Sequence, residues 1–173
     1  MKLRKEIEPQ LEIAEKLYSE ILKSVMEYAD FCDENGDEEN IAYQKLEEKL
    51  HILTRKDMTQ FNLLEWWEEE GVEVLAFRIA LPDPLIVENI TKEELSEIIC
   101  SRLQWSDDFD DDSFKGEFNL YLDEYYYNFL KLNFKKTYNY SKIFCAQKNK
   151  DKSLFELTDE EKIKKLRNDG KFR

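Results

Sequence analysis

The sequence predicts an α+β fold, in which an N-terminal helical hairpin and further helices pack on an antiparallel sheet formed mainly by the C-terminal half. Apolar residues recur at helical spacing through the first third of the chain, and they alternate with a period of two in several later stretches. No linker rich in Gly, Pro or Ser interrupts the 173 residues. We therefore expect one α+β domain over residues 1–173.

Two helices are expected at the start. From residue 8 to residue 32, apolar residues follow in alternating steps of three and four, which places them on one side of a helix that Asn35 and Gly36 end. A second helix is expected from Ile41 to Leu53. The short polar turn between them implies an antiparallel hairpin. A third candidate helix begins at Asp57 and ends at Gly71.

The middle of the chain combines a predicted strand with a strong helix start. Residues 72–81 alternate Leu75, Phe77 and Ile79 with smaller or charged residues, which is typical of a strand with one buried face. Pro82 is expected to end it. A helix should follow to about Gln104.

That helix has the clearest local sign in the chain. Thr91 and Glu94 have the spacing of a capping box, and Ile90 and Leu95 occupy the two positions of a hydrophobic staple.

The C-terminal half supplies the predicted sheet. Residues 117–134 are dense in Phe, Tyr and Leu, and we interpret them as two strands. A helix through Leu122, Tyr126, Phe129 and Leu130 is the alternative. Residues 143–147 and 153–157 flank a lysine-rich turn and predict a β-hairpin. A short final helix is expected after Thr158, which has Glu161 three residues on.

The charge is large and uneven. The chain has 26 Lys and Arg against 39 Asp and Glu, a net charge of −13. Residues 1–70 and 71–130 each carry a net charge of −10, whereas residues 131–173 carry +7. No run of about 18 apolar residues occurs, so we expect a cytoplasmic protein without a membrane span. The three widely spaced cysteines are expected to be reduced and buried.

Several kinds of chemistry are excluded by composition. A single His51 rules out a multi-histidine metal site, and four well-separated glycines rule out a phosphate-binding loop. The aspartate run of residues 107–112 lacks the glycine and the bidentate glutamate of a calcium loop. We expect no catalytic residue, no metal and no cofactor. An enzyme or ligand-binding domain that uses a carboxylate pair and tyrosines of residues 121–140 is the alternative.

The basic C-terminal quarter is rich in aromatic residues, as nucleic-acid-binding surfaces are. The acidic remainder of the chain argues against a nucleic-acid partner, because it would repel a polyanion.

The acidic residues next to tryptophans form the candidate site. They combine negative charge with large flat side chains that often anchor interfaces. The candidate partner-binding residues are Glu65, Trp66, Trp67, Glu68, Glu69, Glu70, Trp105, Asp107, Asp108, Asp110, Asp111 and Asp112.

The sequence therefore predicts a non-enzymatic protein that covers a basic partner protein with its acidic surface. In size and charge the chain is similar to bacterial immunity proteins, and this resemblance of composition implies inhibition of a toxin or nuclease. An adaptor subunit of a larger complex is a further alternative. The sequence predicts no oligomeric state.

Overall fold

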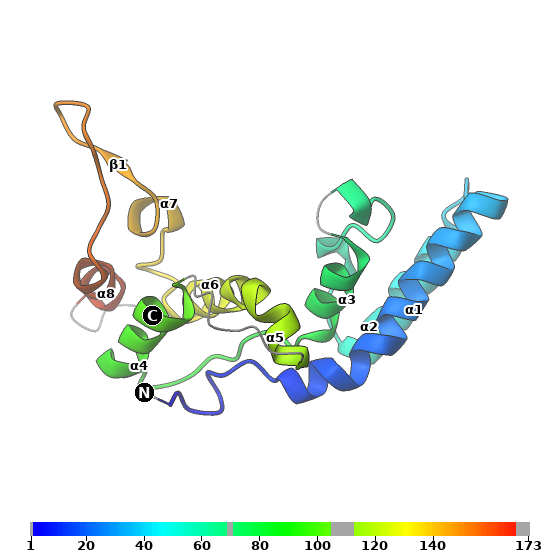
Figure 1. Ribbon diagram of the computed structural model, residues 1–173, viewed down its shortest axis with the longest axis horizontal. Helices are drawn as coiled ribbons and strands as arrows, with labels where there is room; N and C mark the ends of the chain where they lie inside the picture. The colour runs from blue at the N-terminus through cyan, green and yellow to red at the C-terminus, as the bar shows by residue number, and fades with distance from the viewer. Residues whose placement is uncertain (1, 69–70, 105–112, 169–173) are drawn as a thin grey trace. The chain divides into compact units, whose positions relative to one another are not determined.

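The protein is mostly helical, and helix accounts for 63% of the residues that the structure describes (Figure 1). The computed structural model describes residues 2–68, 71–104 and 113–168, without the side chain of Trp67. Within these residues the strands are β1 (Gln147–Lys148) and β2 (Leu154–Phe155), which pair antiparallel. The predicted α+β fold with a C-terminal sheet is therefore wrong.

The chain divides into two compact units, and we describe each by itself. The hairpin unit comprises residues 10–83 and 112–118, and the three-segment unit comprises residues 1–9, 84–111 and 119–173. The single domain expected over residues 1–173 stays a prediction. Among the described residues, no helix combines the length and the apolar composition that crossing a membrane requires.

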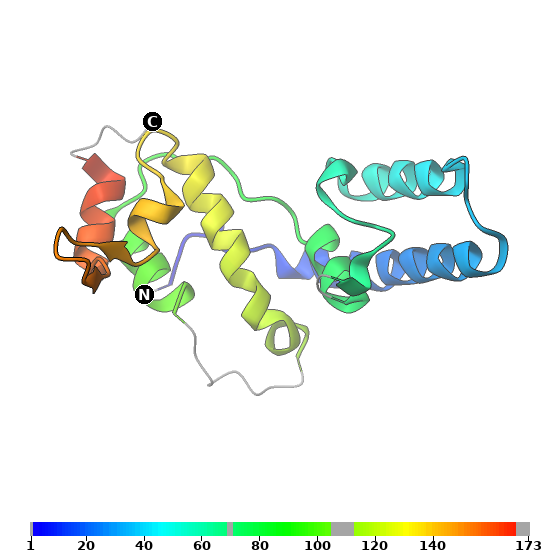
Figure 2. The same ribbon diagram turned by 90° about the horizontal axis from the view of Figure 1, so that it is seen from above.

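The predicted helical hairpin is confirmed. Helices α1 (Leu11–Asn35) and α2 (Ile41–Thr54) lie side by side in the hairpin unit (Figure 2). Gly36 ends α1 at φ 68°, a backbone conformation that a residue without a β-carbon adopts at little cost. Its amide donates to the carbonyl oxygen of Cys32 at 2.9 Å. Tyr28 and Tyr43 join the two helices edge to face, with ring centroids 5.8 Å apart.

The strand predicted over residues 72–81 is wrong, because the segment forms helix α3 (Val72–Ala80). Its buried residues fall on both faces of the predicted strand: Val72, Val74, Leu75, Ala76, Phe77, Ile79 and Ala80. A helix that is buried on most of its surface has apolar residues at nearly every position, so the period of its apolar residues does not distinguish it from a strand. Pro82 follows the end of α3, as expected.

Aromatic rings pack against one another in the core of the hairpin unit. Phe77 of α3 is fully buried, and its ring stacks on Phe118 of α5 (Phe114–Phe118) with centroids 4.4 Å apart and planes 3° apart. Tyr18 of α1 contacts Phe118 at 5.2 Å. Residues 112–118 thus join the rest of the unit through their aromatic side chains.

The third predicted helix is replaced by two short 3₁₀ turns, η1 (Met58–Gln60) and η2 (Trp66–Glu68). Phe61 is extended between them and interrupts the helical path.

Just before η1, Lys56 is only 8% exposed, and its Nζ donates to the carbonyl oxygen of Arg78 at 2.7 Å. The same ammonium lies 3.2 Å from the Asp83 carboxylate, so Lys56 fixes residues 78–83 beside the end of α2.

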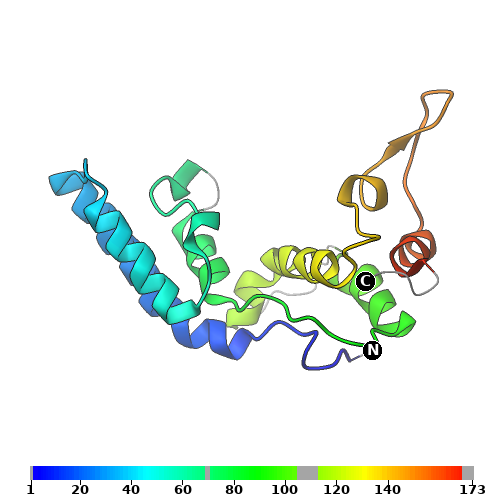
Figure 3. The same ribbon diagram turned by 180° about the vertical axis from the view of Figure 1, so that it is seen from behind.

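Both predicted capping boxes are confirmed in the three-segment unit. Thr91 and Glu94 cap α4 (Lys92–Glu97), which continues as a π-helical turn, η3 (Ile98–Arg102). Thr158 and Glu161 cap α8 (Asp159–Arg167). Helices α4 and α8 pack side by side (Figure 3). The reciprocal side-chain bonds of a capping box are local in sequence, which explains why the sequence predicts them well.

The two strands predicted over residues 117–134 are wrong, and the helical alternative is confirmed. After a 3₁₀ turn, η4 (Asn119–Tyr121), the chain forms α6 (Leu122–Asn133). Its buried residues recur at helical spacing: Leu122, Tyr125, Tyr126, Phe129, Leu130 and Asn133.

Asn133 is fully buried and ties α6 to a distant extended segment. Its Oδ1 accepts from the amide of Val87 at 2.8 Å, and its Nδ2 donates to the carbonyl oxygen of Leu85 at 2.9 Å. One amide side chain thus satisfies one backbone donor and one backbone acceptor of the extended segment.

The C-terminal hairpin is confirmed at its predicted place but is shorter. Ile143 belongs to helix α7 (Tyr140–Ile143), and the strands that follow contain two residues each. The expected burial of the cysteines is wrong, because Cys100 is exposed and Cys32 and Cys145 are half-buried; all three are free thiols.

Candidate partner-binding surfaces

The described part of the predicted site is an acidic turn in the hairpin unit. Glu65 and Glu68 are exposed, and Trp66 between them is half-buried in η2. The amide of Glu65 donates to Oδ1 of Asn62 at 3.0 Å, which shapes the turn just before η2. The two carboxylates therefore face solvent on a short and locally braced element.

The other predicted residues lie outside the described part of the chain. They are Glu69, Glu70, Trp105, Asp107, Asp108, Asp110, Asp111 and Asp112, together with the side chain of Trp67.

The hairpin unit carries the whole net charge of the protein. It holds 8 Lys and Arg against 21 Asp and Glu, a net charge of −13, whereas the three-segment unit holds 18 of each and is neutral. Residues of like charge in one compact unit repel one another, and together they make the electrostatic potential around the unit more negative. The net negative charge of the chain therefore belongs to the hairpin unit.

Within the hairpin unit, residues 24–44 form the most one-sided stretch, which we name the acidic hairpin end. It joins α1 to α2 and contains seven acidic residues with no Lys or Arg. Six of these side chains are exposed: Glu27, Asp30, Asp33, Glu34, Glu38 and Glu39.

The seventh, Asp37, has a structural role. Its carboxylate accepts from the amides of Ala42 at 3.1 Å and Tyr43 at 2.9 Å, in place of a side-chain cap from Asn40. Burial opposes ionisation of Asp37, but these amide hydrogen bonds outweigh it and lower the pKa of its carboxyl group. Asp37 thereby fixes the entry into α2 and the geometry of the acidic hairpin end.

Large apolar side chains are exposed at the same end of the hairpin. Met26 and Phe31 of α1 are 47% and 42% exposed, and Ile41 at the start of α2 is 50% exposed. Exposed apolar groups beside charged ones are the composition of an interface, in which the apolar groups lose water on binding.

The sequence interpretation missed this surface because it treated residues 33–40 only as a turn. Glu27, Asp30 and Glu34 recur in steps of three and four on the side of α1 that faces away from its apolar stripe. The excess of acidic residues along that side of α1, together with Phe31 outside the apolar stripe, is the pattern that would have located the acidic hairpin end.

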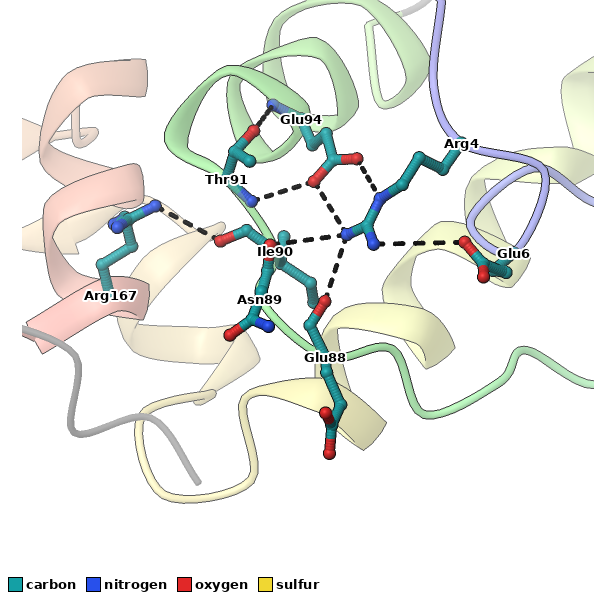
Figure 4. Close-up of polar contacts among 8 residues, drawn as sticks. All are labelled: Arg4, Glu6, Glu88, Asn89, Ile90, Thr91, Glu94 and Arg167. Carbon is teal, nitrogen blue, oxygen red and sulfur yellow. Dashed lines mark hydrogen bonds and ion pairs between the residues drawn. The ribbon is translucent and has the colours of Figure 1, made fainter.

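The most buried described carboxylate belongs to Glu94, and it is fully engaged (Figure 4). Its two oxygens accept from Nε and Nη2 of Arg4 at 2.5 and 3.0 Å, and the amide of Thr91 donates to one of them at 2.9 Å. The same guanidinium donates to the carbonyl oxygen of Glu88 at 3.2 Å. These contacts join residues 1–9 to α4.

The pKa of Glu94 is lowered in this arrangement. Burial by itself disfavours the charged form, but the hydrogen bonds from Arg4 and Thr91 outweigh burial. A carboxylate held ionised in this way stabilises the fold and has no proton to give as a general acid near neutral pH.

A second carboxylate cluster matches the alternative prediction of paired acids with tyrosines. Arg102 lies between Glu8, at 3.1 Å, and Glu97, at 3.5 Å. The hydroxyl of buried Tyr126 donates to Oε2 of Glu8 at 3.4 Å, and burial is the main cause that raises the pKa of Tyr126. Arg102 forms an ion pair with each carboxylate, so the cluster acts as a cross-link between segments of the three-segment unit.

Two further features bear on ligand binding. An open hollow of about 440 Å³ on the three-segment unit is lined by Lys92, Glu93, Ser96, Glu97, Cys100 and Ser101. In the hairpin unit, Nδ1 of His51 donates to the carbonyl oxygen of Lys56 at 2.7 Å. Over the described ranges, no three His, Cys, Asp or Glu side chains come together as a metal site would require.

Comparison of the chain with protein-family models, with curated proteins and with solved structures found no match.

Proposed function

We propose that the protein is a non-enzymatic acidic binding protein that neutralises a basic partner protein, as an immunity-type inhibitor of a bacterial toxin or nuclease. The observation that carries the proposal is the acidic hairpin end. It combines seven acidic residues, no basic residue and three exposed large apolar side chains.

The two kinds of side chain have separate tasks in this proposal. Excess negative charge accelerates the encounter with a cationic surface and disfavours acidic competitors. Met26, Phe31 and Ile41 supply apolar area that is buried in the complex, which slows its dissociation. The partner surface should therefore be basic and should contain an apolar patch.

The acidic turn with Glu65 and Glu68 is the second part of the proposed surface. It belongs to the same unit, its carboxylates are exposed, and Trp66 beside them is half-buried. A partner that spans both parts would be steered by the hairpin unit as a whole.

Affinity capture from the native host at low salt tests the proposal. The wild-type protein is compared with a hairpin variant, Glu27→Gln/Asp30→Asn/Glu34→Gln, and with a turn variant, Glu65→Gln/Glu68→Gln. The wild type should retain a strongly basic protein that raised salt releases, because salt screens charge attraction. The hairpin variant should capture much less of this basic protein than the wild type, and the turn variant should show a smaller decrease.

A matched control removes three exposed carboxylates elsewhere in the same unit, Glu12→Gln/Glu15→Gln/Glu48→Gln. It changes the net charge by the same amount as the hairpin variant and should retain the partner. Equal losses in the control and the hairpin variant would contradict a defined surface. Capture of no basic protein, together with a small molecule that raises the melting temperature, would instead support the ligand-binding alternative.

The inhibitory part of the proposal needs a separate measurement. The captured partner should have an enzymatic or toxic activity that one equivalent of the wild-type protein abolishes and that the hairpin variant leaves intact. A partner that keeps its activity in the complex would support the adaptor alternative. A gene for a basic toxin beside the gene for this protein would be the cheapest supporting observation.

A further inference from the structure

The three-segment unit contains a surface of opposite charge, which we name the lysine–tyrosine surface. It lies in residues 135–155, where six exposed lysines meet a single acidic residue: Lys135, Lys136, Lys142, Lys148, Lys150 and Lys152, with Asp151. None of these lysines forms an ion pair with another described residue. Their charge is therefore available to an anion.

The lone carboxylate of this segment is used internally. Asp151 accepts from the amide of Ser153 at 3.0 Å and from its hydroxyl at 2.6 Å. The amide of Asn149 in turn donates to the carbonyl oxygen of Ser153 at 2.8 Å, which closes the turn. Asp151 thus shapes the hairpin that carries Lys148, Lys150 and Lys152.

Aromatic rings lie within the same segment. Tyr140 is 48% exposed, and its ring contacts Tyr127 of α6 at 5.2 Å and Phe144 at 5.9 Å. Tyr138 contacts Phe144 on another side at 6.2 Å. Burial, followed by the neighbouring Tyr140, raises the pKa of Tyr127 to about 12.

Hydrogen bonds hold the segment in place. The hydroxyl of Thr137 donates to the carbonyl oxygen of Leu166 in α8 at 2.6 Å. Asn139 accepts from the amide of Lys142 at 3.0 Å and caps α7, and Nε2 of Gln147 donates to the carbonyl oxygen of Lys142 at 2.7 Å. Figure 1 shows the path from α6 through α7 and β1 to α8. The lysines and rings are thus presented on a braced element.

The distribution of acids weakens the sequence argument against a polyanion. That argument relied on an acidic block sharing one domain with the basic tail. Of the 39 acidic residues, 21 belong to the hairpin unit, and the three-segment unit is neutral overall. Residues 135–155 themselves carry a net charge of +5.

We propose that the lysine–tyrosine surface binds single-stranded nucleic acid. Exposed lysines neutralise phosphates, and exposed aromatic rings stack on bases regardless of their sequence. The half-exposed ring of Tyr140 adds a surface on which a base can stack to the charges of the lysines. The surface consists of one helical turn and a narrow hairpin. A single strand suits this surface, because the backbone of a single strand bends easily enough to follow it. The proposal does not depend on the partner of the hairpin unit.

Fluorescence anisotropy of a labelled 20-nucleotide oligo(dT) with the full-length protein at 50 mM salt tests the proposal. The variant Lys135→Gln/Lys136→Gln/Lys142→Gln should lower the affinity by roughly tenfold or more. It should also make the slope of log affinity against log salt less negative by about 2, because three phosphate contacts are lost. All three side chains are exposed, so the variant should fold.

A control variant, Lys5→Gln/Lys92→Gln/Lys164→Gln, removes three exposed lysines elsewhere in the same unit. It should bind like the wild type. Equal losses in both variants would overturn the proposal, because net charge rather than a site would then govern binding. Absence of binding by the wild type at 50 mM salt would overturn it as well.

The ring of Tyr140 separates nucleic acid from other polyanions. Tyr140→Leu should lower the oligonucleotide affinity by about tenfold, whereas Tyr140→Phe, which keeps the ring, should retain it. Melting curves of both variants check that the fold is kept. If polyglutamate of equal charge displaces the oligonucleotide equally well, the surface binds acidic protein instead. Tighter binding of a duplex would also overturn the assignment to single strands.

Discussion

The two units differ in how their chain segments are joined. In the hairpin unit, residues 112–118 meet residues 10–83 through aromatic rings, above all where Phe118 stacks on Phe77. In the three-segment unit, buried polar side chains also make the joins, such as Asn133 to Leu85 and Arg4 to Glu94.

The difference shows two ways of keeping a discontinuous unit together. Apolar packing depends little on charge, so a unit that relies on it tolerates a net charge of −13 and can present that charge to a partner. Buried hydrogen bonds and ion pairs depend on exact partners and on protonation. Substitutions of similar size should therefore act differently in the two units.

The largest effect is expected in the aromatic core of the hairpin unit. Phe77→Ala removes a fully buried ring that stacks on Phe118 and should lower the free energy of unfolding by about 3–5 kcal/mol. Urea denaturation measures the loss. Phe31→Ala, which truncates an exposed ring of the same unit, should cost less than about 0.5 kcal/mol. A loss below about 1 kcal/mol for Phe77→Ala would mean that the rings do not form the core.

The next largest loss of stability is expected at Asn133, whose side-chain amide is buried in the three-segment unit. Asn133→Ala leaves the amide of Val87 and the carbonyl oxygen of Leu85 without their partner and should cost about 3 kcal/mol. Asn128→Ala, on the exposed side of the same helix, should cause no loss, because alanine is the better helix former. Denaturation of both variants followed by circular dichroism compares them. Separate transitions for Asn133→Ala would show that the two units unfold independently, against the single-domain prediction.

Glu94→Gln should cost about 2 kcal/mol at pH 7, because the charged bond to Arg4 is lost while the cap geometry is kept. The pKa of Glu94 is lowered by folding, so its contribution is complete above about pH 4.3 and is lost as pH falls through the folded pKa. The stabilities of wild type and variant should therefore converge in acid.

The control for this comparison is Glu161→Gln, the same substitution at the same position of an exposed capping box. Its cost should be only about 0.5 kcal/mol, since no arginine pairs with Glu161 among the described contacts. Denaturation of each variant from pH 7 to pH 3 gives both sets of values. A difference between wild type and Glu94→Gln that stays constant in acid would contradict the pKa assignment.

The smallest effect should have opposite signs in the two units. Glu34→Gln removes an acid from the last turn of α1 in the acidic unit and should raise the free energy of unfolding by roughly 0.3 kcal/mol. Asp123→Asn removes an acid from the first turn of α6 in the neutral unit and should lower it by a similar amount. Thermal unfolding at low salt detects both changes. Equal signs would show that local helix charge does not control these sites.

The sequence predicts best what is decided locally. The boundaries of α1 and α2 and the two capping boxes follow from residues within a few positions of one another. Alternation misleads at residues 72–81, because tertiary burial surrounds α3 on most sides and makes nearly every position apolar. The alternation of apolar residues misleads again before α6. A strand with one buried face would bury Leu120, whereas Leu120 is 55% exposed. Helical spacing from Leu122 to Asn133 was the better guide.

The candidate site is predictable in part. Net charge and its excess in the first half of the chain are properties of composition, so the sequence predicts a basic partner. The division of charge between units depends on residues 84–111, with a net charge of −6, joining residues 119–173, with a net charge of +5. No local pattern encodes that pairing of segments. Exposure of Phe31 likewise depends on which sides of α1 the other helices cover.

The interleaving of the two units sets an order for folding during translation. Residue 118 completes the hairpin unit, whereas the three-segment unit needs α8, whose last residue is Arg167. At ribosomal rates of about 5–20 residues per second, these events are separated by roughly 2–10 s. During that interval the nascent chain holds Leu3 and Ile7 without the later segments that bury them. All residues of the acidic unit have therefore been synthesised while residues of the three-segment unit are still being added.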